Sequence, residues 1–532
     1  MRADRALLNG RIITVDKSNS IQEAVAIRAG RILAVGSDEE IKCLIGPGTA
    51  ITDLEGASVT PGFVDSHIHT VEYGLSGMVL DLRYPAVQSI EDIKRLVEKA
   101  AAEKQEGTWI RGVGWDEALL EERRPPTRHD IDLVSLNHPV VLDAQTPVEV
   151  ANTYALNLVG AEYEENFDGL LASGDVSWRI RQRARDYTVE ECMKAILRAQ
   201  EALFSVGVTA QKEAGATDTM IEAYRRLHAE GRLKIRSYVM IGIHNGRTSV
   251  ELAREAVSKY KPWGDDTLAI RAVKCSFDGS GGSRTAWLYE PWNRNYKEVD
   301  SVNVGGPIVQ RPQDYPEIAR IIHSAGFQMG AHCVGDQAID RYLDAVEAAL
   351  LDTPKTNCRH SVIHNNLPTD EALRKELSLR DNLVVEATSA YLYFVGDTYA
   401  GNFGPHRSRR LLPMRTMIER GIVVGNGCDW NTCLVDPLYG IYGAVTRRPR
   451  KGVYGEKPFG VDECVGVMDA LCTYTWNSAY CMFWEDKIGS IEPGKYADIV
   501  VWDKDILATQ PEDILGLKVT ETILEGETVH RI

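Results

Sequence analysis

Eight short apolar runs alternate with amphipathic, helix-like segments through the middle of this chain. Runs of this length between turn residues are typical of buried strands, and their alternation with helices is typical of parallel sheets. Eight such units predict an α/β fold, a (β/α)8 barrel of TIM type, whose active site lies at the carboxyl ends of the strands. The predicted strands cover residues 61–69, 207–210, 235–241, 269–274, 327–332, 361–364, 383–386 and 422–425.

The two ends of the chain have a different sequence pattern, in which short apolar runs are separated by turn residues. At 532 residues the chain exceeds what one hydrophobic core usually supports. We therefore expect a small β-sandwich domain built from residues 1–58 and 481–532, beside a barrel domain of residues 59–480. Residues 72–200, roughly, are too many for a loop after the first barrel strand, and we expect an inserted substructure that covers the barrel mouth.

Local motifs add three finer expectations. Asn9-Gly10 and Ala29-Gly30 each separate two apolar runs, which predicts a β-hairpin at both places. Thr188 and Glu191 have the spacing of a capping box, which predicts the start of a helix.

Composition limits the partners and the compartment. A net charge of −16 argues against nucleic acid and against an anionic membrane surface, because both require a basic face. The start of the chain lacks the apolar core of an export signal, and no apolar run reaches the ~20 residues of a spanning helix. Ten cysteines without CxxC pairs are typical of reduced thiols. We expect a cytoplasmic homo-oligomer, a dimer, that acts on a small molecule.

The first predicted barrel strand ends in His67 and His69. Alternate side chains of a strand share a face, so both imidazoles would point the same way. Imidazole is a common ligand for divalent metals, and one strand could supply half of a metal site. The alternative is a pair of hydrogen-bonded turn histidines.

Ligand-type residues at other strand ends favour the metal site. Strand four ends in Lys274, strand five in His332 and strand six in His364, while Asp429 follows strand eight. A barrel projects the carboxyl ends of its strands into one cavity, where these residues would meet His67. Lys212, at the predicted end of strand two, is a rival to Lys274, and an ion pair with Asp278 is the alternative for Lys274.

These residues, in this order, form a pattern that resembles the metal-dependent amidohydrolase superfamily, and within it the subfamily of N-substituted formamide deformylases. The motifs that carry the resemblance are residues 59–69, 273–280, 331–340, 363–365, 427–430 and 489–498. The resemblance implies one or two divalent ions, Zn²⁺ first, with Mn²⁺, Co²⁺ or Fe²⁺ as alternatives.

The resemblance also implies a role for each ligand. His67 and His69 would hold the more buried ion with Asp429. His332 and His364 would hold the second, and Lys274, carbamylated by CO₂, would bridge the two. Asp429 would in addition be the catalytic residue, taking a proton from the attacking water and passing it to the leaving nitrogen.

The sequence indicates substrate-contacting residues less clearly than metal ligands. Arg284 follows the glycine-rich run after Lys274, and Trp115 and Asp116 lie in the insertion; each could face substrate, with solvation or packing as the alternative. His360 precedes His364 at the start of the same strand, which favours a structural, hydrogen-bonded role. Residues 143–186 lack the Asp-Gly-His run that relatives carry, so the substrate of those relatives cannot be assigned to this chain by analogy.

We expect a metal-dependent hydrolase of non-peptide carbon–nitrogen bonds, in an amide, formamide, carbamate or urea. The same site could instead serve ester or lactone hydrolysis or decarboxylation. A non-catalytic scaffold on the same fold is the third possibility, and the complete set of ligand-type residues argues against it.

Overall fold

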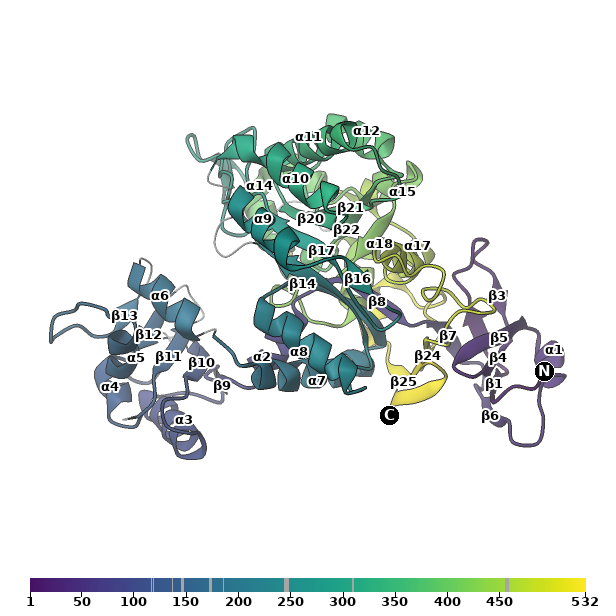
Figure 1. Ribbon diagram of the computed structural model, residues 1–532, viewed down its shortest axis with the longest axis horizontal. Coiled ribbons are helices and arrows are strands. Elements are labelled where there is room, and N and C mark those ends of the chain that lie inside the picture. Colours follow the sequence, from purple (N-terminus) through teal and green to yellow (C-terminus); the bar gives the residue numbers. More distant parts are fainter. Residues whose placement is uncertain are drawn as a thin grey trace. The chain divides into compact units, whose positions relative to one another are not determined.

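The chain folds into two compact units in the computed structural model, one of Met1–Thr70 with Ile196–Ile532 and the other of Val71–Ala195 (Figure 1). The structure describes residues 1–115, 117, 119–135, 137–144, 148–171, 175–184, 186–243, 248–308, 311–454 and 459–532. Within these ranges, no helix is long and apolar enough to cross a membrane.

Eight parallel strands form the main sheet of the first unit, in the order β23-β22-β21-β20-β17-β15-β14-β8. β23 also contacts β8, so the sheet is nearly closed, and the predicted (β/α)8 barrel is confirmed. The strands are β8 (Phe63–Ile68), β14 (Val208–Ala216), β15 (Arg236–Gly242), β17 (Leu268–Ser276), β20 (Gln328–Cys333), β21 (His360–His364), β22 (Leu383–Ala387) and β23 (Val424–Asn426).

Amphipathic helices separate these strands in the chain and lie outside the sheet (Figure 1). Their apolar faces supply buried residues such as Ile221 and Leu227 of one helix and Ile339 and Val346 of another. The larger ones are α7 (Val189–Ser205), α8 (Asp218–Ala229), α9 (Val250–Lys259), α10 (Tyr315–Ser324), α11 (Asp336–Asp352) and α12 (Asp370–Ser378). α14 (Gly396–Arg409), which is kinked at Gly404, also lies between strands, and α16 (Pro437–Thr446) follows the last one. Thr188 and Glu191 bond reciprocally before α7, which confirms the predicted capping box.

Two small sheets pack against each other, one from the N-terminal part alone and one from both ends of the chain. One sheet has the order β5-β4-β1-β6 and the other β26-β25-β24-β7-β2-β3. Buried Leu7 and Val25 of the first share a core with Ile499 and Ile523 of the second, which confirms a β-sandwich built from both ends. The strands are β1 (Arg5–Leu8), β2 (Arg11–Ile13), β3 (Ile21–Gln22), β4 (Ala24–Arg28), β5 (Arg31–Gly36), β6 (Ala50–Asp53), β7 (Ser58–Pro61), β24 (Ile499–Trp502), β25 (Val519–Leu524) and β26 (Glu527–Arg531).

One of the two predicted hairpins is present. β4 and β5 pair directly across Ala29 and Gly30, both with positive φ, as a two-residue turn requires. The hairpin predicted at Asn9-Gly10 is wrong. β1 pairs with β4 and β6, whereas β2 pairs with β3 and β7, so this turn carries the chain from one sheet to the other.

The second unit, Val71–Ala195, has its own five-stranded sheet and its own core. Its elements include β9 (Leu80–Asp81), β10 (Ile110–Trp115), β11 (Val140–Ala144), β12 (Glu149–Ala151), β13 (Leu170–Leu171), α3 (Ile90–Glu103), α4 (Arg128–Asp132), α5 (Thr153–Leu158) and α6 (Asp175–Ala184). It follows the first barrel strand. Its predicted role as a cover of the barrel mouth stays a prediction, as do the expected domain limits.

Candidate metal centre

Four barrel strands present histidine or lysine side chains at or near their carboxyl ends. His67 is the penultimate residue of β8 and His69 follows that strand, while His364 is the last residue of β21. In the parallel ladders Ser276 lies opposite His332, and Cys333 lies opposite His364, so these ends are level. Asp429 follows β23, and its backbone N–H donates to the carbonyl of His67 at 2.8 Å.

The tightest group consists of His67, His364 and Asp429, whose ligand atoms all lie within 4.8 Å of one another. Oδ1 of Asp429 is 3.4 Å from Nε2 of His67 and 3.4 Å from Nε2 of His69. Three buried residues and one partly exposed histidine thus direct nitrogen and oxygen atoms at one point. Such a donor set fits a divalent ion.

His332 extends this group on the side of His364. The centroids of these two rings are 4.5 Å apart, and those of His67 and His364 are 5.0 Å apart. Nε2 of His332 lies 2.9 Å from the carbonyl oxygen of Gly279, which only accepts hydrogen bonds. Nε2 therefore carries the proton, and Nδ1 of His332 is the nitrogen with a free lone pair.

Lys274 also reaches the group. Its Nζ is 3.5 Å from Nε2 of His67, and burial lowers the pKa of Lys274 to about 8. No ion pair of Lys274 with a carboxylate occurs among the described residues, and the alternative partner, Asp278, bonds elsewhere. The rival, Lys212, lies well inside β14 and not at its end, because this strand continues to Ala216; it pairs with Glu386 instead.

Burial keeps the imidazoles neutral. It lowers the pKa of His67 to about 3 and that of His332 to about 4, in both cases with help from Lys274, and it lowers the pKa of His364 well below its usual value. Neutral imidazole is the form that binds a metal. Burial alone would raise the pKa of Asp429, but contacts with His67 and His69 hold it well below the usual range.

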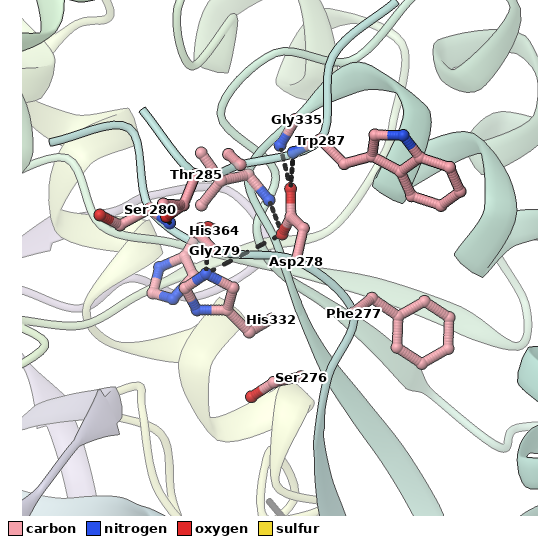
Figure 2. A network of polar contacts seen from close by, with 12 residues as sticks. Ser276, Phe277, Asp278, Gly279, Ser280, Thr285, Trp287, His332, Gly335 and His364 are labelled. Atoms are coloured by element: carbon pink, nitrogen blue, oxygen red, sulfur yellow. Dashed lines mark hydrogen bonds and ion pairs between the residues drawn. The ribbon is translucent and has the colours of Figure 1, made fainter. Parts of the chain in front are cut away.

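Asp278 connects two loops beside His332 (Figure 2). Its buried carboxylate accepts hydrogen bonds from the backbone N–H groups of Trp287 at 2.9 Å, Val334 at 3.0 Å and Gly335 at 2.8 Å. It also lies 3.9 Å from Nε2 of His332. Burial raises the pKa of Asp278 to about 7, against the effect of these three donors. The contacts tie the end of β17 to the residues that follow His332.

Like Asp278, Asp65 accepts hydrogen bonds from the backbone beside a histidine of the group, here His67. Its Oδ1 accepts from the backbone N–H of His67 at 3.0 Å, and its Oδ2 from that of Cys428 at 3.1 Å. The backbones are so close here that a Cβ atom on Gly427 would lie 2.4 Å from the backbone nitrogen of His67. Asp65 and Gly427 together fix Asp429 against the end of β8.

Three residues at these strand ends have left-handed backbone conformations, as do other residues elsewhere in the chain. His364, Asn365 and Asp429 have φ angles of 73°, 48° and 49°. Left-handed φ in residues other than glycine costs on the order of 1–3 kcal/mol each and is found preferentially at functional sites.

Tyr391 belongs to this group, although it was not among the residues predicted from the sequence. Its hydroxyl donates a hydrogen bond to Oδ2 of Asp429, and its ring stacks on His364 with centroids 5.6 Å apart. Tyr391 follows β22, whose penultimate residue, Glu386, pairs with Lys212, and tyrosine matches no metal-ligand spacing. Its position after a barrel strand was the one usable signal.

The three candidate substrate contacts are less clear. The indole of Trp115 is buried in the core of the second unit and donates to the carbonyl of Leu142 at 2.9 Å, which is the packing alternative. Arg284, with φ of 56°, is half-buried in the loop after β17, and its guanidinium forms no bond to the described part of the chain. Asp116 lies outside the described residues. Substrate contact by all three stays a prediction.

A second histidine cluster is occupied by hydrogen bonds. His323, Cys358 and His360 lie within ligand distance of one another. However, Nδ1 of His360 accepts from the backbone N–H of Met329, its Nε2 bonds to Nδ1 of His323, and Nε2 of His323 bonds to the carbonyl of Thr353. Every imidazole nitrogen is occupied, as the structural role predicted for His360 requires.

Known proteins match this chain over nearly its whole length. The profile described as "Amidohydrolase family" matches residues 50–530. Protein LONG AFTER FAR-RED 3 from Arabidopsis thaliana is 27% identical, with 97% of this chain and 91% of that protein covered. N-substituted formamide deformylase from Arthrobacter pascens is 25% identical, covering 98% and 97%. An uncharacterized metal-dependent hydrolase from Pyrococcus horikoshii OT3 superposes with a TM-score of 0.79 at 25% identity, covering 96% and 99%.

Proposed function

This chain belongs to the amidohydrolase family and is a hydrolase, and we propose that it cleaves a non-peptide carbon–nitrogen bond in a small amide, formamide, carbamate or urea. The observation that carries the proposal is the convergence of His67, His364 and Asp429, with ligand atoms within 4.8 Å of one another. The choice of a carbon–nitrogen bond is supported by the similarity to the formamide deformylase over 98% of this chain.

We propose that His67, His69 and Asp429 hold one divalent ion and that His332 and His364 hold a second, with carbamylated Lys274 as the bridging ligand. The neutral, buried imidazoles and the free Nδ1 of His332 fit this assignment. Zn²⁺ is the proposed ion, with Mn²⁺, Co²⁺ or Fe²⁺ as alternatives. Bound divalent ions lower the pKa of water toward neutrality and polarise a carbonyl group.

Asp429 is the proposed general base and acid. Its carboxylate would take one proton from the attacking water and return it to the nitrogen that leaves as an amine. Overall, water adds across the carbon–nitrogen bond, and Asp429 ends in its starting state. The buried position of Asp429 keeps bulk water from competing for that proton.

The test pairs metal analysis with a panel of matched amides and esters that share one acyl group. We expect one to two metal ions per chain and turnover of the amide members, with loss on chelation and recovery with Zn²⁺. Turnover of the esters alone would favour the ester or lactone alternative. A protein with far less than one ion per chain, inert with added Zn²⁺ and Mn²⁺, would favour the scaffold.

Asp429→Asn isolates the proposed proton transfer. We expect a fall in kcat of roughly 10²–10⁴-fold while most of the metal remains bound, because the amide keeps a ligand oxygen and loses the base. Asp436→Asn is the matched control: Asp436 caps α16 on the same segment, and asparagine caps a helix equally well. Near-normal turnover of Asp429→Asn would sink the assignment.

A further inference from the structure

The two carboxylate oxygens of Asp429 face different groups. Oδ1 lies 3.4 Å from Nε2 of both His67 and His69, whereas Oδ2 accepts a hydrogen bond from the hydroxyl of Tyr391. We propose that Tyr391 is a positioning residue that fixes the plane of the Asp429 carboxylate, so that Oδ1 is kept for the metal and Oδ2 for the proton of the attacking water. This inference rests on the proposed role of Asp429 as general base.

The position of Tyr391 is set by the loop after β22. The backbone N–H of Ser389 donates to Oδ1 of Asn426 at 3.1 Å, and the Ser389 hydroxyl donates to the carbonyl of Gly440 at 2.7 Å. Asn426 is the last residue of β23, three residues before Asp429. The donor and its acceptor are therefore anchored to the same strand end.

A row of buried aromatic rings supports the side chain of Tyr391. Tyr399 packs edge-on against it at 5.7 Å, Phe403 against Tyr399 at 5.4 Å, and Trp292 against Phe403 at 4.7 Å. The ring of His364 stacks on that of Tyr391. A ring held between neighbours has little freedom to move its hydroxyl, which is the condition for precise placement of a catalytic group.

The hydrogen bond restricts the carboxylate in a specific way. A carboxylate oxygen has two lone pairs, and the hydroxyl of Tyr391 occupies one of those on Oδ2. The second lone pair stays available for the proton from water. Without the hydroxyl, the carboxylate is free to rotate about its Cβ–Cγ bond and to turn Oδ2 away from the water. Tyr391 is itself 6% exposed, and its hydroxyl bonds to Asp429, so we expect it to act through Asp429 and not on substrate.

Tyr391→Phe removes the hydroxyl and keeps the ring. We expect kcat to fall roughly 10²-fold with KM within about twofold of wild type, because misplacement of a catalytic group by about an ångström has an effect of this size. Bound metal per chain should not change. In the Co²⁺-loaded protein, the visible absorption bands should shift, because the orientation of a ligand carboxylate alters the field at the ion.

Tyr342→Phe is the matched control. Tyr342 of α11 is also buried, and its hydroxyl donates to the backbone carbonyl of Met329 at 2.9 Å and not to Asp429. The control should lose stability and leave kcat and the Co²⁺ spectrum unchanged. If Tyr391→Phe and Tyr342→Phe have the same kcat and the same Co²⁺ spectrum as wild type, the inference is overturned. Loss of metal from Tyr391→Phe would also overturn it, since the residue would then serve metal binding.

The proposed function can fail separately. If wild type hydrolyses the esters and not the amides of the matched panel, the carbon–nitrogen assignment fails. The kcat of Tyr391→Phe is then compared with that of wild type on the ester. If wild type is inert on the whole panel, the Co²⁺ spectra of the two variants still decide whether Tyr391 orients Asp429.

Discussion

Nε2 of His332, at the end of β20, and the carbonyl oxygen of Gly279, in the loop after the adjacent strand β17, are 2.9 Å apart. A carbonyl oxygen accepts and never donates, so this contact fixes the tautomer of His332 with its proton on Nε2. The proposed second metal ion would then be bound through Nδ1. The contact explains why the loop after β17 matters to a ligand on β20.

Replacement of His332 by two different amides tests that tautomer. The side-chain amide of His332→Asn lies near the Nδ1 position, and that of His332→Gln lies near the Nε2 position. We expect His332→Gln to lose about one metal ion per chain and His332→Asn to retain more, as measured by metal analysis after dialysis. The reverse order would mean that Nε2 is the ligand atom.

The ion pair of Lys212 with Glu386 crosses the barrel interior, with both side chains fully buried. Removal of one partner leaves the other charge unpaired, so we expect Lys212→Met to lower the free energy of unfolding by about 3–5 kcal/mol. The double variant Lys212→Met, Glu386→Leu should lose much less unfolding free energy than the sum of the losses in Lys212→Met and Glu386→Leu alone. Urea unfolding of wild type, the two single variants and the double variant measures these free energies. Additive losses would contradict the pairing.

The two buried lysines should differ in their reaction with CO₂. Lys274 forms no ion pair with a carboxylate among the described residues, and burial lowers its pKa to about 8, so we expect it to form a carbamate. Protein equilibrated with ¹³C-bicarbonate and Zn²⁺ should show one carbamate signal by ¹³C NMR. The signal should vanish in Lys274→Met and persist in the Lys212→Met, Glu386→Leu double variant. Its loss in the double variant alone would move the modification to Lys212.

His360 should contribute to acid denaturation. Burial, with the neighbouring His323 and Lys355, lowers its pKa from 6.5 to about 3. Between these values the unfolded chain binds a proton that the folded chain does not, so stability falls as the pH falls from about 6.5 to 3. The slope from this group is about 1.4 kcal/mol per pH unit. The pH dependence of unfolding should be shallower by that amount in His360→Gln, and an unchanged slope would contradict it.

Asp278 should be structural support for the site. Asp278→Asn places an amide N–H₂ against backbone donors that need an acceptor. We expect a loss of about 1–3 kcal/mol in unfolding free energy, measured in urea. An increase in stability would show that the carboxylate's burial outweighs its hydrogen bonds.

Sequence periodicity predicted the barrel correctly because it is a local property. All eight strands were found, and the capping box at Thr188 formed, since both depend on residues a few positions apart. The hairpin at Asn9-Gly10 was wrong because a turn motif does not specify which strands pair across it. The length of β14 was also missed, and this error had placed Lys212 at a strand end.

The sequence by itself determined the order of the strands along the chain and the type of residue at each strand end. Hydrophobic periodicity and residue identity are local properties that do not depend on tertiary contacts. Only the tertiary structure decided which lysine lies beside His67, which nitrogen of His332 is free, and that Tyr391 reaches Asp429. The contact of Lys274 with His67 joins two strands that are not neighbours in the sheet, and the other two contacts join segments at the ends of adjacent strands, so all three depend on how the strands are arranged in the barrel.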